Sequence, residues 1–196
     1  MGGVMVENFE GYLYHIVRYK KLKQNQKLHF GSLDNQFFKT MNEWSFVVGD
    51  SDLNSIVLNK KLTDFTSEEQ RVLKGYVYES CMIIRELVLE IVRLNEFADY
   101  PSRLKCMYCV KTKEQAENWI PILKRMNSKN PPLQIVKLKA KGKIFRGDGN
   151  LMIRNTRSLE SKFELARKYW NNATKSDNEE ILFIGNAEVE EIYELT

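Results

Sequence analysis

The sequence predicts an α+β fold with a mixed, mostly antiparallel sheet, one long helix and several shorter helices. Strand patterns lie near both ends of the chain and helical patterns lie between them, so the terminal strands are expected to share a sheet. The length of 196 residues suits one domain that buries a sizeable core. With 43% hydrophobic and 29% charged residues, the composition excludes a disordered, collagen-like or disulfide-dense chain. We therefore expect residues 1–196 to form a single domain.

The first strand is predicted over residues 11–19, where aromatic and β-branched residues alternate. One face carries Tyr12, Tyr14 and Ile16, and the other carries Leu13, His15 and Val17. Both faces are apolar enough to be covered, so the sequence predicts that His15 lies on a largely apolar face. Residues 28–65 keep neither helical nor strand spacing, and they are predicted to be an irregular excursion rich in aromatic side chains.

The long helix is predicted to begin at Thr66, because Thr66 and Glu69 form a capping box. Apolar residues then recur at helical spacing, so we expect one stripe to face the core. The stripe comprises Val72, Tyr76, Ile83, Leu87, Ile91 and Leu94. Pro101 follows shortly afterwards and restricts the residue before it, which places the helix end near Phe97.

Alternating residues predict a second strand over 104–110 and a third over 136–144. Lysines occupy every second position of the third strand, from Lys137 to Lys143, which is typical of a solvated strand or of an edge strand protected against aggregation. A helix is predicted over 114–125, and Pro121 should kink or shorten it. Another helix is expected from the cap Ser158 to Trp170.

The chain is predicted to close with a hairpin. Residues 180–184 and 187–195 read as its two strands, and Gly185-Asn186 reads as the turn between them. The last twenty residues carry acidic side chains and no Lys or Arg. A carboxylate at the start of the first hairpin strand is the one that we expect to be catalytic.

The charge balance argues against nucleic acid as a partner. Thirty basic and 26 acidic residues give a net charge of +4, which is small for a protein that binds phosphates over its whole surface. The three cysteines are odd in number and no signal peptide precedes the first strand, so a cytoplasmic protein is expected. No apolar run approaches the roughly 18 residues of a membrane helix, and no membrane association is expected.

No metal site is predicted. Cys106 and Cys109 have the spacing of a redox or zinc pair, but positions i and i+3 of a strand point to opposite faces. The segment that starts at Asp50 begins like a calcium loop, yet Ser55 replaces the required Gly and Lys61 replaces the closing Glu. Phosphate-binding loops, serine-hydrolase elbows and zinc-protease motifs do not occur in the sequence.

Three stretches resemble the ADP-ribosyltransferase superfamily, in particular its branch with a His, Tyr, Glu triad, and they occur in the family's order. Their residues are Tyr14-His15-Ile16-Val17, Cys106-Met107-Tyr108-Cys109-Val110 followed by Gln115-Ala116-Glu117-Asn118-Trp119, and Glu180-Ile181-Leu182-Phe183-Ile184-Gly185-Asn186-Ala187-Glu188-Val189. The segment Pro101-Ser102-Arg103 is similar to one in uncharacterised bacterial proteins of that superfamily. The resemblance therefore implies the family's split sheet.

The resemblance also implies chemistry on NAD as substrate, with no metal. Glu180 would stabilise the oxocarbenium-like state and hold the 2′-hydroxyl, as carboxylates do in glycoside hydrolysis. Tyr108 would stack on nicotinamide, His15 would bond a ribose hydroxyl, and Arg103 would pair with the pyrophosphate. The sequence differs from the family pattern where Ile16 replaces a Gly after the His and Cys106 replaces a Gly that leads the Tyr strand. The acceptor is not specified by the sequence.

Other interpretations stay open at this stage. His15 and Tyr108 suit a packed core, Arg103 suits a surface ion pair, and Glu180 suits a solvated hairpin. The same fold also accommodates a non-catalytic module that binds a nucleotide or a protein, and the lysine-rich strand suits a polyanion.

Overall fold

The structure is a computed structural model that describes residues 6–126, 130–151, 158–171 and 178–195. The predicted α+β class is confirmed. The elements are β1 (Val6–Val17), β2 (Lys27–Phe30), α1 (Gln36–Asn42), β3 (Val47–Val48), β4 (Ser51–Asp52), α2 (Leu53–Asn59), α3 (Ser67–Glu96), β5 (Met107–Cys109), α4 (Lys113–Met126), β6 (Gln134–Asp148), α5 (Leu159–Trp170) and β7 (Glu179–Glu194). Short 3-10 turns follow α2 and β6, over Leu62–Asp64 and Gly149–Leu151.

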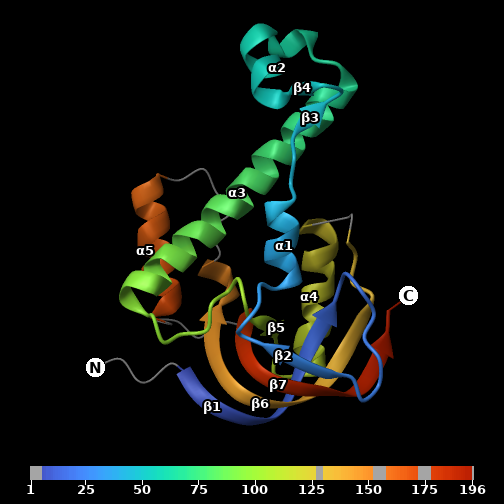
Figure 1. Cartoon of the computed structure of the whole chain (residues 1–196), viewed down its shortest axis with the longest axis vertical. Coiled ribbons are helices and arrows are strands. Elements are labelled where there is room, and N and C mark those ends of the chain that lie inside the picture. Colours follow the sequence, from blue (N-terminus) through green and yellow to red (C-terminus); the bar gives the residue numbers. More distant parts are fainter. Residues whose placement is uncertain (1–5, 127–129, 152–157, 172–177, 196) are drawn as a thin grey trace.

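The main sheet has the order β1-β6-β7-β2, and its strands pair antiparallel. Two short strands share one edge of β7: β5 pairs with residues 181–183, and β2 pairs with residues 185–188. This side of the sheet is therefore split. The sheet then curls until β1 meets the end of β5, where Tyr14 and Val110 exchange two backbone hydrogen bonds of 2.9 Å. The curl brings residues of β1, β5 and β7 to one place (Figure 1).

The predicted closing hairpin is wrong. β7 runs as one continuous strand through Gly185, which adopts a φ of +136° that L side chains rarely take. Gly142 lies opposite it on β6, and a Cβ atom there would stand 2.1 Å from the carbonyl oxygen of Ile184. The two facing glycines let the backbones approach closely where β6 and β7 curve together (Figure 1).

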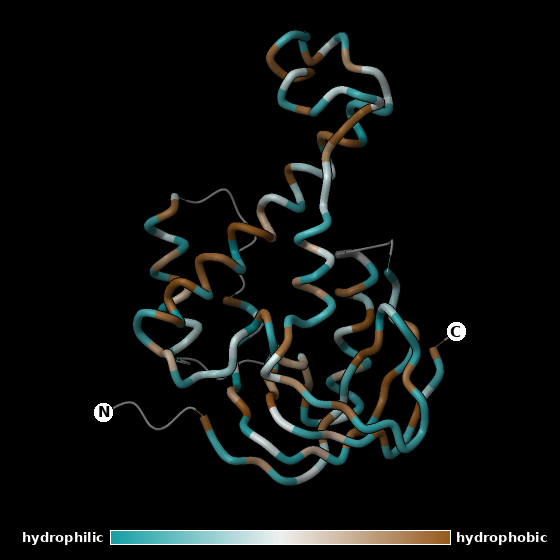
Figure 2. The backbone as a smooth tube through the Cα atoms, in the orientation of Figure 1, coloured by the Kyte–Doolittle hydropathy of each residue, from teal (hydrophilic) through white to brown (hydrophobic). Residues whose placement is uncertain are grey.

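Of the two alternatives for the lysine-rich strand, the solvated face is confirmed and the edge position is wrong. β6 lies between β1 and β7, and its outward lysines meet acidic side chains on both neighbours. Lys141 pairs with Glu10 at 2.9 Å, and Lys137 pairs with Glu191 at 2.7 Å. Figure 2 shows the resulting alternation of hydrophilic and hydrophobic residues along the strands. Lys137 therefore pairs with the acidic C-terminal strand β7, and Lys141 pairs with β1.

The long helix α3 has the predicted capping box of Thr66 and Glu69, but its buried face is not the predicted stripe. Leu87 is 46% exposed and Leu94 is 58% exposed. The buried positions of the helix include apolar and charged residues together: Met82, Arg85, Glu86, Val88, Leu89, Val92 and Arg93. Val88, Leu89 and Val92 pack against the sheet and α5, which lies beside α3 in Figure 1. Trp170 of α5 donates from Nε1 to the carbonyl oxygen of Leu89 at 2.8 Å.

Residues 28–65 are not irregular, contrary to the prediction. They form the short strands β2 to β4 and two helices of seven residues, capped by Asn35 and Asp52. Helices of two turns are too short for a periodic pattern to stand out from chance. Figure 1 places α2, β3 and β4 at the far end of α3. The helix α4 continues past Pro121 to Met126, while the predicted cap Ser158 of α5 is confirmed.

Replacing Gly142 by Ala is expected to lower the free energy of unfolding by about 2–3 kcal/mol, because the added methyl group meets backbone rather than a movable side chain. Urea denaturation followed by circular dichroism measures the change. Gly75→Ala is the matched control, since Gly75 lies within α3 with open space around its Cβ position. That substitution should stabilise the chain by about 0.5–1 kcal/mol, and a similar effect at both glycines would contradict the role of Gly142.

Candidate functional site

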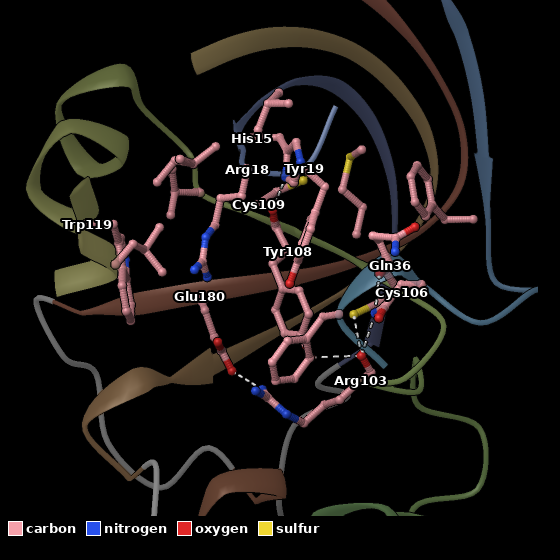
Figure 3. Close-up of a pocket in the computed structure, with 18 of the residues that line it drawn as sticks. His15, Arg18, Tyr19, Gln36, Arg103, Cys106, Tyr108, Cys109, Trp119 and Glu180 are labelled. Carbon is pink, nitrogen blue, oxygen red and sulfur yellow. Dashed lines mark hydrogen bonds and ion pairs between the residues drawn. The ribbon is translucent and has the colours of Figure 1, made fainter. Parts of the chain in front are cut away.

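A cavity of about 600 Å³ opens where the curled sheet brings β1, β5 and β7 together, and its walls include all four residues predicted for the site. His15 lies on β1, Tyr108 on β5 and Glu180 on β7, and Arg103 lies in the segment before β5 (Figure 3). The volume is within the range of ordinary small-molecule sites. Residues separated by up to 165 positions in the chain thus share one pocket, as the site prediction required.

His15 is fixed by its neighbour across the closure of the sheet. Its Nδ1 lies 2.8 Å from the carbonyl oxygen of Tyr108. Because a carbonyl oxygen can only accept, Nδ1 carries the proton and Nε2 keeps its lone pair. Burial lowers the pKa of His15, although the hydrogen bond from Nδ1 raises it in part. The ring is therefore a neutral group with one acceptor nitrogen left for a ligand.

Glu180 is buried at the start of β7, so it is not the solvated hairpin charge that the alternative interpretation describes. Its Oε1 accepts a hydrogen bond from the hydroxyl group of Tyr169 on α5 at 2.5 Å and an ion-pair contact from Nη1 of Arg103 (Figure 3). Gly147 lies opposite Glu180 in the sheet, and a Cβ atom at Gly147 would come within 2.5 Å of the Tyr169 hydroxyl. The absence of a side chain there makes room for Tyr169 beside the carboxylate.

Arg103 has a different environment from the one predicted. Its side chain is 2% exposed, its Nε donates to Glu86 at 2.8 Å, and its Nη1 donates to the Tyr169 hydroxyl group at 2.7 Å and to Glu180. The guanidinium also lies over one face of the Tyr108 ring, 5.1 Å from the centroid. These contacts make it a buried ion-pair partner rather than a surface one. A pyrophosphate contact by Arg103 would require breaking the pairs that hold it.

The ion pairs continue into α3 through Glu86. This carboxylate is 0% exposed and also accepts from Arg85, whose Nη2 lies 2.5 Å from Oε1. Burial alone would raise the pKa of Glu86, but the charges and hydrogen bonds of Arg103 and Arg85 lower it to about 2. Two arginines and two glutamates therefore form one buried group, which we call the Arg/Glu quartet: Arg85, Glu86, Arg103 and Glu180.

Sequence reasoning missed Arg85, Glu86 and Tyr169. The charged pair occupies a face of α3 that a search for apolar spacing passes over, and Tyr169 directly precedes Trp170, the last residue of the predicted helix. Arg18 was also missed. It follows the last residue of β1 and lines the cavity, and no spacing or motif distinguishes it in the sequence.

Neither cysteine forms part of a metal site in the described residues. Cys106 belongs to the cluster between the sheet and α5, and Cys109 belongs to the cluster on the other face, as the strand pattern predicted. Burial raises the pKa of both thiols. Within the described ranges, no group of three or more His, Cys, Asp or Glu side chains is arranged to hold a metal ion. The helices of the same ranges include none that is both long and apolar enough to span a bilayer.

A sequence model of one protein family, described as "Protein of unknown function (DUF2441)", matches residues 13–195, and the chain therefore belongs to this family. A search of curated proteins gave no match. The family description names no activity, so a functional proposal has to rest on the geometry of the cavity.

The stability of the protein is expected to fall as the pH is lowered from about 5 to about 2, because the pKa of Glu86 is about 2 in the folded chain and ordinarily 4.5. In this interval the unfolded chain binds more protons, so the free energy of unfolding decreases with falling pH. Glu86→Gln should flatten this dependence and cost roughly 3–5 kcal/mol at neutral pH, since it leaves Arg85 and Arg103 with less compensating charge.

Urea denaturation at a series of pH values measures both effects. Glu68→Gln is the control, because Glu68 is exposed on the same helix and its nearest basic partner, Arg71, is 4.0 Å away. It should leave both the stability and its pH dependence nearly unchanged. If the free energy of unfolding of Glu86→Gln depends on pH between about 5 and about 2 as that of the wild type does, the stabilising role of the Glu86 carboxylate is contradicted.

Proposed function

We propose that the protein is an NAD-dependent enzyme, an ADP-ribosyltransferase or NAD glycohydrolase, whose active site is the cavity of His15, Tyr108 and Glu180. One observation carries the proposal. The three residues that resemble the superfamily's triad come from three separate strands, and they line a single cavity of ligand size. Packing alone does not require residues from distant strands to share a cavity with these chemical types in this order.

The walls of the cavity suit the parts of a nicotinamide nucleotide. With Nδ1 of His15 bonded to Tyr108, Nε2 can accept a hydrogen bond from a ribose hydroxyl group. The ring of Tyr108 has Arg103 over one face, and its hydroxyl group donates to the carbonyl oxygen of Arg103 at 2.8 Å. A nicotinamide ring would therefore stack on the opposite face of Tyr108.

Glu180 would act on the bond between ribose C1′ and the pyridinium nitrogen. When this bond breaks, both electrons leave with nicotinamide and positive charge develops on the ribose. In the described part of the chain, both hydrogen bonds to Glu180 fall on Oε1, which leaves Oε2 to hold the 2′-hydroxyl group and face the developing charge. Water that then adds to C1′ gives hydrolysis, and a nucleophile of another molecule gives transfer.

Arg103 and Tyr169 would act as positioning residues. They hold one oxygen of Glu180 from two directions and thereby fix the rotamer of the carboxylate. A carboxylate held before the substrate arrives loses little freedom during the reaction, which is the basis of preorganised electrostatic stabilisation. This role replaces the pyrophosphate contact expected for Arg103.

The cytoplasm is the proposed location. All three cysteines of the chain are free, although two of them are buried, and free thiols persist in a reducing compartment. NAD is available there to an enzyme of this type. No nucleic acid or membrane partner is part of the proposal.

Glu180→Gln is expected to lower the rate of nicotinamide release from NAD at least about 100-fold, because the amide keeps the shape but not the negative charge. Chromatographic measurement of nicotinamide during incubation of the full chain with NAD tests this. Glu179→Gln is the matched control, since the neighbouring carboxylate pairs with Arg146 at 3.3 Å outside the cavity, and it should retain activity within about threefold.

Thermal unfolding of both variants verifies that they fold. Tyr169→Phe provides a second measure, because it removes one hydrogen bond from Glu180 and keeps the carboxylate. We expect it to lower kcat about tenfold. Activity that survives in Glu180→Gln would overturn the catalytic role. Binding of ADP-ribose by the wild-type chain without any release of nicotinamide would identify a non-catalytic nucleotide-binding module instead.

A further inference from the structure

Arg18 lines the cavity, and one of its side-chain nitrogens is buried without a partner among the described residues. The side chain extends from the end of β1 into the space that His15, Tyr108 and Glu180 also line (Figure 3). Its Nε donates to the carbonyl oxygen of Asn130 at 3.0 Å, which fixes the guanidinium. Its Nη2 is shielded from solvent, and among the described residues it has no hydrogen-bond partner. Buried polar groups are normally satisfied, so this atom calls for an explanation.

Within the described ranges, the charge on Arg18 is not balanced by a carboxylate, whereas the charges on the buried Arg85 and Arg103 are. Arg85 and Arg103 belong to the Arg/Glu quartet, in which each guanidinium contacts a carboxylate. Burial lowers the pKa of Arg18, and the groups that oppose this are the phenols of Tyr19 and Tyr78 rather than a carboxylate. A desolvated cation in this position gains much from an anion that enters the cavity.

We infer that Arg18 is the anion-binding residue of the cavity and that it holds a phosphate group of the ligand. The identification of that phosphate as part of a nicotinamide nucleotide rests on the proposed function. The assignment of Arg18 as an anion site rests on its unpartnered Nη2. Four basic and two acidic side chains line the cavity. Because the quartet uses Arg85 and Arg103 internally, Arg18 is the arginine that remains for a ligand within the described walls.

The chemistry of the guanidinium favours phosphate. With Nε already bonded to the chain, the two Nη atoms form a planar fork that matches two oxygens of one phosphate group. Trp119 of α4 also lines the cavity. Its indole ring therefore serves as a reporter of anything that binds near Arg18 (Figure 3).

Inorganic pyrophosphate is the probe that tests the anion site by itself. Calorimetric titration of the full chain at constant ionic strength should show binding that weakens at least about tenfold in Arg18→Gln. Arg18→Lys keeps the charge but loses the fork, so its pyrophosphate affinity should lie between those of the wild type and Arg18→Gln. Arg71→Gln is the control, because Arg71 is exposed on α3 away from the cavity. This variant should bind pyrophosphate with the affinity of the wild type.

Equal pyrophosphate affinity in the wild type and Arg18→Gln would overturn the inference, as would the absence of pyrophosphate binding by the wild type. Thermal unfolding verifies that the variants fold. If Arg18→Gln does not fold, the pyrophosphate affinity of Arg18→Lys is compared with that of the wild type instead. Quenching of Trp119 fluorescence, lost in Trp119→Phe, provides a second measurement of binding within the cavity.

The two proposals fail in different ways. Pyrophosphate binding that depends on Arg18 in a chain that never releases nicotinamide would support the anion site and overturn the enzymatic proposal. If NAD is cleaved, Arg18→Gln should raise KM at least about tenfold and leave kcat within about threefold, because phosphate binding is remote from the broken bond. Cleavage with an unchanged KM would support the enzyme and overturn the role of Arg18.

Discussion

The pairing of Arg103 with Glu86 and Glu180 is the interaction on which the rest of the site depends. Each of these ions would cost several kcal/mol to bury alone, so the three must meet inside the fold. Glu86 belongs to α3, Glu180 to β7, and Arg103 to the segment before β5. Their contacts therefore fix the helix, the sheet and the segment relative to one another, and Tyr169 adds α5 to the same point. The long helix is thus tied to the sheet by charge as well as by apolar packing.

The curl of the sheet determines where the cavity lies. β6 and β7 bend together at Gly142 and Gly185, and the bridge between Tyr14 and Val110 closes the ring of strands on the other side. Without the bend, β1 and β5 would lie on opposite edges of the sheet, and His15 would not reach the carbonyl oxygen of Tyr108. The same closure leaves the starts and ends of the strands open toward the cavity, where Glu180 begins β7 and Arg18 follows β1.

The sequence was informative where local chemistry decides the structure. Alternation predicted the strands β1, β5 and β6, the capping box predicted the long helix, and the order of His15, Tyr108 and Glu180 predicted residues that share a cavity. Prediction failed where a distant contact decides. Leu87 looked like a core residue because it lies in a series of apolar residues at helical spacing. This spacing does not reveal that α3 buries Glu86 instead. Gly185-Asn186 looked like a turn because these residue types are typical of turns. The positive φ of Gly185 instead accompanies a close approach to Gly142 on β6, which the local sequence does not reveal.

The Arg/Glu quartet contains equal numbers of arginines and glutamates, so the cavity does not present Glu180 to the ligand as an isolated negative charge. It presents a carboxylate paired with a guanidinium, and the two charges together form a dipole. The field of a dipole falls more steeply with distance than that of a charge, so its effect on a developing cation depends on close placement of the ribose. A second contact that anchors a remote part of the ligand provides such placement. On the proposed function, the contact between Arg18 and a phosphate group would provide this anchor when the ligand binds.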